Sequence, residues 1–200
     1  MVAPCTSRKE DKSSNDLFIT PIEALNAIKP YLMKDLVDHR VTDVLDPCSG
    51  LGDISHWLSQ NTTCNIIANE LYPCPDRSKL VFQPHYEQDF LDDNNTIPIA
   101  DVILANAPYN KAVEFVLKGF DYSSIQWHFL RLSFLESQTR FQQLFNLGKL
   151  TDVYIFTFRV SCDKGYDREE TANSVCYAWY RFDKYYCGQP KLHWLTKGGM

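Results

Sequence analysis

Polar side chains that could hold a ligand follow three short apolar segments of this sequence. Asp46 comes after residues 41–45, Glu70 after residues 65–69, and Asn106 after residues 101–105. The three segments are rich in Val, Ile and Leu and are typical of buried strands. The carboxyl ends of parallel strands meet at one edge of a sheet, which is where ligands bind. We therefore expect these three side chains to converge on one site.

A turn with two glycines follows Asp46. Gly50 and Gly52 allow the backbone to approach a ligand closely, and Asp46 and Pro47 precede them. The dinucleotide pattern G-x-G-x-x-G is absent, because Ser55 stands where its third glycine would lie. This disfavours a nicotinamide-dependent oxidoreductase. The alternative is a tight strand-to-helix turn with no ligand.

Two further carboxylates could complete a nucleotide site. Glu70 lies 20 residues after Gly50, a separation that suits recognition of ribose hydroxyls. Asp89 could accept a hydrogen bond from an adenine amino group while Phe90 lies against the ring. Solvated surface acids are the alternative for both carboxylates.

The segment Asn106-Ala107-Pro108-Tyr109 could bind a planar amino group. The Asn106 side-chain oxygen can accept one amino hydrogen and the Ala107 carbonyl the other, which directs the nitrogen lone pair toward an electrophile. Tyr109 can stack on the ring of a base. The alternative is a turn that merely ends a strand.

Helices and strands alternate along the chain. Helices are predicted over residues 21–36, 54–60, 111–119 and 138–145, with Thr20 as the first N-cap and Pro21 at N1. Further strands are predicted over residues 126–132, 152–160 and 174–182. This order indicates an α/β fold with a mostly parallel sheet and an antiparallel edge hairpin. Residues 1–16 are predicted to be a disordered tail before one domain at 17–200.

Composition restricts the class of protein. The chain has 200 residues and a formal net charge of −5, so any contact with nucleic acid must come from a local basic patch. Lys111, Arg131, Arg140, Arg159, Lys164 and Arg168 could contact phosphates, with scattered surface charge as the alternative. The seven cysteines show no C-x-x-C spacing, and we expect neither a disulfide framework nor a metal site. No signal peptide or membrane span is evident, which predicts a soluble intracellular protein.

Together these motifs resemble the S-adenosylmethionine-dependent adenine-N6 DNA methyltransferases, in the compact form common in phages and other viruses. Residues 46–53 are similar to the cofactor loop of that family, residues 106–109 to its Asn/Asp-Pro-Pro-Tyr/Phe motif, and residues 18–21 to the segment that closes over the cofactor. The order of the motifs is that of the gamma arrangement. Residues 129–136 and 172–180 are similar as well, and the resemblance spans about residues 18–195.

The resemblance implies a Rossmann-like methyltransferase fold with a seven-stranded sheet. It implies that Thr20, Asp46, Pro47, Gly50, Gly52, Glu70, Asp89 and Phe90 bind S-adenosylmethionine, and that Asn106, Ala107, Pro108 and Tyr109 hold the target. Asp46 and Gly50 would face the methionine part of the cofactor, Glu70 the ribose and Asp89 the adenine amino group.

Ala107 departs from the family, because it replaces the first proline of the usual pair. The carbonyl acceptor is kept but the rigid φ of proline is lost. This departure and the short length leave an inactive binding subunit as an alternative. The acidic net charge and the lack of an evident recognition domain leave RNA or a protein glutamine open as the acceptor beside DNA. No large recognition domain is evident, so specificity would come from loops such as residues 162–173 or from a partner. Besides nucleic acid, the partners to consider are another protein or a second copy in a homodimer.

Overall fold

The computed structural model describes residues 17–170 and 175–197. The predicted disordered tail at residues 1–16, the end of the predicted recognition loop at 171–173, and Ser174 lie outside the described residues. In the described ranges, no helix combines the length and the apolar composition needed to cross a membrane.

Seven strands form one sheet in the order β2-β1-β3-β4-β6-β5-β7. They are β1 (Asp43–Asp46), β2 (Asn65–Ala68), β3 (Val102–Ala105), β4 (Ile125–Arg131), β5 (Leu150–Phe156), β6 (Tyr177–Asp183) and β7 (Lys191–Leu195). Strand β6 is antiparallel to both of its neighbours, and every other pairing is parallel. The predicted mostly parallel, seven-stranded α/β sheet with an antiparallel pair is confirmed.

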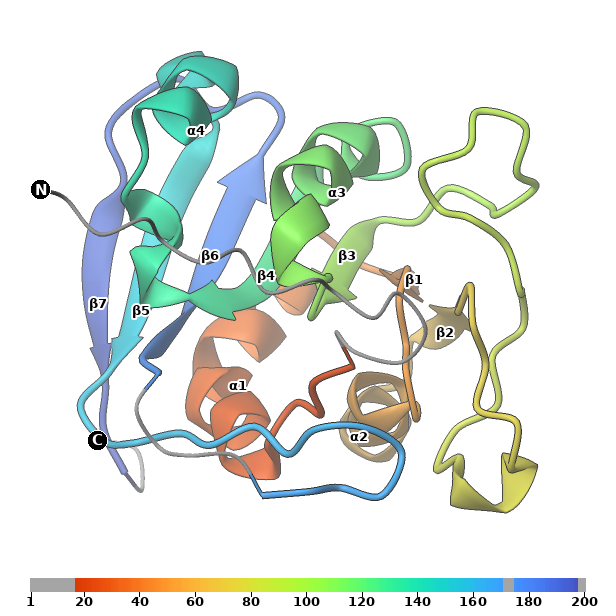
Figure 1. Cartoon of the computed structure of the whole chain (residues 1–200). Coiled ribbons are helices and arrows are strands. Elements are labelled where there is room, and N and C mark those ends of the chain that lie inside the picture. Colours follow the sequence, from red (N-terminus) through yellow and green to blue (C-terminus); the bar gives the residue numbers. More distant parts are fainter. Residues whose placement is uncertain (1–16, 171–174, 198–200) are drawn as a thin grey trace, which may run out of the picture.

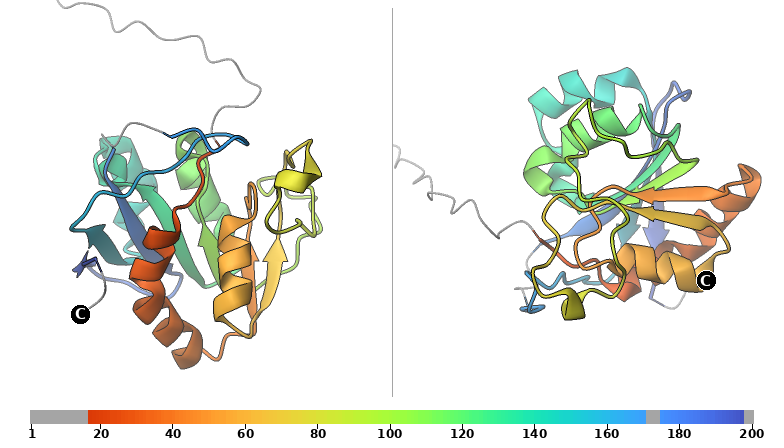
Figure 2. Two further views of the ribbon diagram at one scale, coloured as in Figure 1. Left: turned by 90° about the horizontal axis from the view of Figure 1, so that it is seen from below. Right: turned by 90° about the vertical axis from the view of Figure 1, so that its right-hand side faces the viewer.

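Helices cover both faces of this sheet. Helices α1 (Ile22–Asp38) and α2 (Asp53–Asn61) lie below it in Figure 1, while α3 (Ala112–Gly119) and α4 (Gln138–Gln143) lie above it. The turned views in Figure 2 show the same three layers. Buried residues of α1 recur at helical spacing, as the sequence predicted, and pack with Trp127 and Trp179 of the sheet.

Polar contacts fix α1 to the sheet. Arg181 of β6 forms an ion pair with Asp35 of α1, its Nε lying 2.7 Å from Oδ2 and its Nη2 2.9 Å from Oδ1. The indole nitrogen of Trp127 donates to the same Asp35 Oδ2, and that of Trp179 donates to the carbonyl oxygen of Ala24. These bonds satisfy the polar groups that the aromatic core would otherwise leave unpaired.

Two details differ from the sequence predictions. The predicted hairpin of β5 and β6 is present but does not form the edge, because β7 pairs with β5 on its outer side. The N-cap of α1 is Pro21 rather than Thr20. The Thr20 hydroxyl instead accepts a hydrogen bond from Asn106, which draws it away from the helix end.

Candidate functional site

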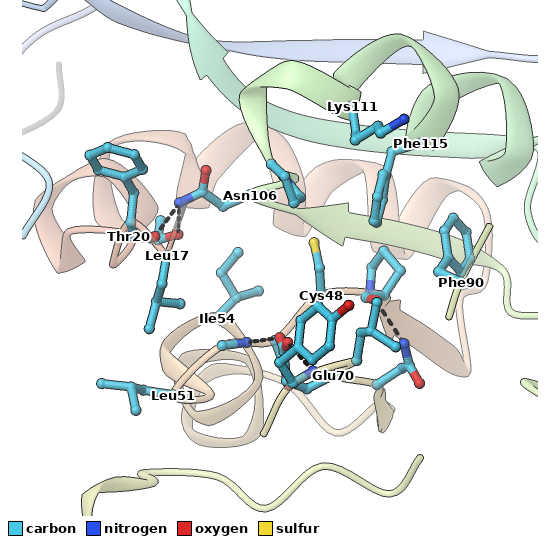
Figure 3. Close-up of a pocket in the computed structure, with 18 of the residues that line it drawn as sticks. Leu17, Thr20, Cys48, Leu51, Ile54, Glu70, Phe90, Asn106, Lys111 and Phe115 are labelled. Atoms are coloured by element: carbon cyan, nitrogen blue, oxygen red, sulfur yellow. Dashed lines mark hydrogen bonds between the residues drawn. The ribbon is translucent and has the colours of Figure 1, made fainter. Parts of the chain in front are cut away.

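A cavity of about 680 Å³ lies at the carboxyl ends of the parallel strands (Figure 3). The strand order reverses here, since the chain passes from β1 outward to β2 and returns to the other side of β1 as β3. Doubly wound sheets bind ligands at such a reversal. The volume is within the range of small-molecule and cofactor sites.

Eight of the residues proposed from the sequence line this cavity: Thr20, Pro47, Gly50, Glu70, Asp89, Phe90, Asn106 and Pro108. The other four, Asp46, Gly52, Ala107 and Tyr109, are not part of its wall. The fold thus brings together the ends of three strands, as expected, but it places part of each motif behind the surface that a ligand would touch.

Glu70 connects the turn after β1 with the loop after β2. Its Oε2 accepts from the amide of Gly50 at 2.7 Å, and its Oε1 accepts from the amide of Tyr72 at 2.9 Å. Each carboxylate oxygen can accept a second hydrogen bond. Glu70 can therefore shape the turn and still accept bonds from a ligand's hydroxyl groups.

Buried Asn69 holds two walls of the cavity together, a role that the sequence predictions missed. Its Nδ2 donates to the carbonyl oxygens of Pro47 and Gln88, at 2.9 and 3.0 Å, while its Oδ1 accepts from the amide of Gln88. This places Asp89 opposite the turn at Gly50. The sequence signal was weak, because an Asn at the end of an apolar segment is also common in ordinary turns.

Asp89 and Phe90 differ in exposure. Asp89 is exposed, with Oδ1 accepting from the amide of Leu91 at 2.9 Å. Phe90 is buried and stacks on Phe115 of α3, with 5.2 Å between the ring centroids. Phe115 and the neighbouring Lys111 also line the cavity (Figure 3).

The amide of Asn106 is oriented by the segment before α1. Its Nδ2 donates to the carbonyl oxygen of Phe18 at 2.8 Å and to the hydroxyl of Thr20 at 3.0 Å. Both amide hydrogens are thereby engaged. The Oδ1 atom is left as the hydrogen-bond acceptor of this side chain.

Tyr109 lies beside the cavity, in an aromatic and cationic cluster. Its ring centroid is 5.1 Å from that of Phe18, and the guanidinium carbon of Arg131 lies 4.5 Å from the Tyr109 centroid. Burial raises the pKa of the Tyr109 hydroxyl well above its usual range. Ala107 is buried against the core between the sheet and α3. A base that stacked on Tyr109 would have to share the ring with Arg131.

Asp46 is fully buried behind the turn rather than on the cavity wall. Its Oδ2 accepts from the Ser55 hydroxyl at 2.8 Å, while Oδ1 has no hydrogen-bond partner among the described residues. Desolvation raises the pKa of this carboxyl to about 7, opposed by the Ser55 hydrogen bond. A carboxyl in this position supports the turn and does not reach the ligand directly.

Residues 17–20 and the loop at 161–170 together cover one side of the cavity. The amide of Ile19 donates to the Asp163 carbonyl, and the amide of Gly165 donates to the Leu17 carbonyl. Tyr166 lines the cavity and its hydroxyl donates to the carbonyl oxygen of Tyr72. Figures 1 and 2 both show the loop beside the segment that leads into α1.

Tyr72 and Tyr166 were missed from the sequence. They lie 94 positions apart in loops without periodicity, so no local pattern relates them. Lys111, named from the sequence as a candidate phosphate contact, also lines the cavity. Phe115 could have been found, because it follows Asn106 in the next helix, which faces the same edge of the sheet.

Comparison with known proteins supports the fold. No family model and no curated protein matches the sequence. A candidate RNA methyltransferase from Pyrococcus horikoshii is 16% identical, with a TM-score of 0.57 over 80% of this chain and 83% of that one. A protein from Thermoplasma acidophilum is 12% identical, with a TM-score of 0.51 over 78% and 84%. A candidate O-methyltransferase from Agrobacterium tumefaciens is 9% identical, with a TM-score of 0.50 over 78% of each chain. The chain therefore has the Rossmann-like fold found in methyltransferases.

Proposed function

We propose that this protein is an S-adenosylmethionine-dependent methyltransferase that acts on an exocyclic amino nitrogen, with adenine N6 in DNA as the acceptor. The observation that carries this proposal is the orientation of Asn106. Its amide hydrogens are engaged by Phe18 and Thr20, its oxygen remains as an acceptor, and the residue lines the cavity.

The residues around the cavity fit a nucleoside-bearing cofactor. Glu70 keeps lone pairs for the ribose hydroxyls, and Asp89 can accept from the adenine amino group. Phe90 and Leu91 contribute apolar surface for the base. When bound, the cofactor would supply an electrophilic methyl group.

The chain's own residues would position the acceptor nitrogen. The Oδ1 of Asn106 would accept one amino hydrogen, so that the nitrogen lone pair is directed at the methyl group, while Ala107 is buried outside the cavity wall. Alignment of this kind is the main catalytic requirement, because the methyl donor is already activated. Neither a metal ion nor a strong base is needed for this role of Asn106.

The same chemistry on RNA is the second candidate. The support is a structural neighbour from Pyrococcus horikoshii, described as a candidate RNA methyltransferase, which shares the fold at 16% identity. An amino group on adenine presents the same two hydrogens in DNA and in RNA. The acceptor must therefore be identified by direct assay.

The test is transfer of a radiolabelled methyl group to DNA, RNA and protein supplied in parallel. We expect label in DNA, recovered as N6-methyladenine after digestion. Label in RNA alone would identify the second candidate, and label on glutamine would identify a protein methyltransferase. A protein that binds the cofactor but labels no pool would be a binding subunit.

Asn106→Ala is the accompanying variant. It should abolish methyl transfer and leave cofactor affinity within about twofold, because Asn106 is assigned to the target nitrogen and not to the cofactor. Asn110→Ala is the matched control, since Asn110 lines the same cavity but is not assigned to the target nitrogen. Full turnover by Asn106→Ala would refute the assignment.

A further inference from the structure

Five of the six basic side chains singled out from the sequence differ in their partners. The sixth, Lys164, has no carboxylate within ion-pair distance among the described residues. Arg168 pairs with Asp53 at 2.8 Å, and Lys111 lies 3.5 Å from Glu114. Arg140 of α4 donates to the carbonyl oxygens of Ser133, Phe134 and Glu136, which precede that helix. These three have structural partners within the chain.

Arg131 and Arg159 are different. Within residues 17–170 and 175–197, neither guanidinium lies close enough to a carboxylate oxygen to form an ion pair. In those ranges, the Nε of Arg131 is buried without a hydrogen-bond partner, and the Arg159 guanidinium donates to the sulfur of Cys176. In an acidic protein, arginines without carboxylate partners are the groups available to an anion.

Ring contacts hold Arg131 beside the proposed acceptor site. Its guanidinium carbon lies 4.5 Å from the Tyr109 ring centroid and 6.0 Å from that of Phe18. The carbonyl of the same Phe18 accepts from Asn106. Stacking of this kind fixes the plane of the guanidinium, in which Nε is buried and the terminal Nη groups are the donors left for an anion.

Arg159 borders the same place from the segment after β5. Its Nη1 donates to the Cys176 sulfur at 3.1 Å, and the carbonyl of Cys176 accepts from the amide of Leu132, the residue after Arg131. The Arg131 guanidinium therefore lies on Tyr109 at the end of β4, and the Arg159 guanidinium contacts Cys176, the residue before β6.

Building on the proposed function, we propose that Arg131 and Arg159 bind the backbone phosphates next to the target nucleotide, with Arg131 as the main contact. A planar guanidinium binds phosphate through paired N–H groups and is suited to this role. This local site supplies the contact with nucleic acid that the net charge of −5 does not provide.

The test measures binding rather than catalysis. Fluorescence anisotropy of a labelled short single-stranded DNA is followed over a range of salt concentrations for wild type, Arg131→Gln, Arg131→Lys and Arg159→Gln. Arg40→Gln is the control, because Arg40 is exposed and precedes β1 at the opposite edge of the sheet. Thermal melting is recorded for each variant.

Arg131→Gln should weaken binding about tenfold, to a similar extent for different sequences, and should reduce the slope of log K against log salt by about 0.7. Arg159→Gln should reduce the slope by a similar amount. Arg131→Lys should restore the slope because it restores the charge, and Arg40→Gln should match wild type.

A slope for Arg131→Gln equal to that of wild type would overturn the site, as would a slope for Arg131→Lys that stays as shallow as that of Arg131→Gln. If Arg131→Gln does not fold, the slope of wild type is the test. Two phosphate contacts on a single strand require a slope of about −1.4 or steeper, and a shallower slope would overturn the site. DNA binding that depends on Arg131 without methyl transfer would instead refute the proposed function and leave the anion site standing.

Discussion

Glu70 and Asn106 differ in what their hydrogen bonds leave available for a ligand. Glu70 accepts two backbone amides and retains acceptor capacity on both oxygens. Asn106 has used both of its donors on residues 18 and 20 and retains only its oxygen. The first arrangement suits ligand hydroxyls, and the second suits an amino group.

Glu70→Ala should weaken S-adenosylmethionine binding by about 1.5–3 kcal/mol, because a hydrogen-bonded carboxylate is lost. Calorimetric titration measures this directly. Glu136→Ala provides the control, since Glu136 is an exposed acid outside the cavity wall. Affinity that does not change in Glu70→Ala would place the cofactor elsewhere.

Asp46 gives the fold a defined pH dependence. In the folded protein its pKa is raised to about 7 from an ordinary value of 3.8, mainly by desolvation. The folded state therefore holds this proton in a range of pH where the unfolded state has released it. The contribution of Asp46 to the free energy of unfolding falls as pH rises through that range, by up to about 1.4 kcal/mol per pH unit. Above that range the contribution is constant.

Asp46→Asn removes this titration. The free energy of unfolding of the variant relative to wild type should rise between about pH 4 and pH 7 and then level off. Urea denaturation of both proteins at several pH values measures this difference in the free energy of unfolding. The contributions of the other titrating groups are the same in both proteins and largely cancel. A difference independent of pH would show that Asp46 stays ionised in the folded protein.

At the scale of elements, the turn from β1 into α2 depends on backbone geometry. Gly52 has a φ of +90°, and a Cβ there would meet the backbone oxygen of Phe82 at 2.6 Å and its nitrogen at 2.8 Å. The turn therefore requires glycine for its conformation and for the close approach of the loop that follows β2.

Gly52→Ala should cost more stability than the strain of a left-handed alanine, which is about 1–2 kcal/mol. Gly165→Ala separates the two effects, because Gly165 has a φ of +71° and open space where the methyl group of an alanine would lie. We expect urea denaturation to show the larger loss for Gly52→Ala. Equal losses would mean that the Phe82 segment moves aside without cost.

At the scale of the molecule, one sheet joins the two halves of the chain. Strands β3 and β4 pair in the centre, and α1 is bonded to β4 and β6 through Asp35. A sheet shared in this way favours a single cooperative unit.

We therefore predict that the full chain unfolds in one transition. Tryptophan fluorescence reports on Trp57, Trp127, Trp179 and Trp194, which lie in α2, β4, β6 and β7. Its thermal midpoint should coincide with that from far-ultraviolet circular dichroism. Two separated midpoints would indicate two domains instead of one.

The sequence by itself determined the alternation of elements, most of the sheet, and the strand ends that carry Glu70 and Asn106. These follow from local signals, because apolar runs, turn glycines and strand-end polar residues act over a few positions. Strand β7 was not among the strands predicted from local pattern, since its side chains are mostly exposed at an edge and give little alternation.

Only the tertiary structure decided which residues of the site line the cavity and which of their hydrogen-bonding atoms are already engaged. Asp46 is buried behind the turn, where it accepts from Ser55 of α2, and the Asn106 side chain keeps its oxygen as an acceptor while residues 18 and 20 take both amide hydrogens. Phe18 and Asn106 are 88 positions apart. Contacts at that separation depend on how the layers pack, and they have no signature in the local sequence.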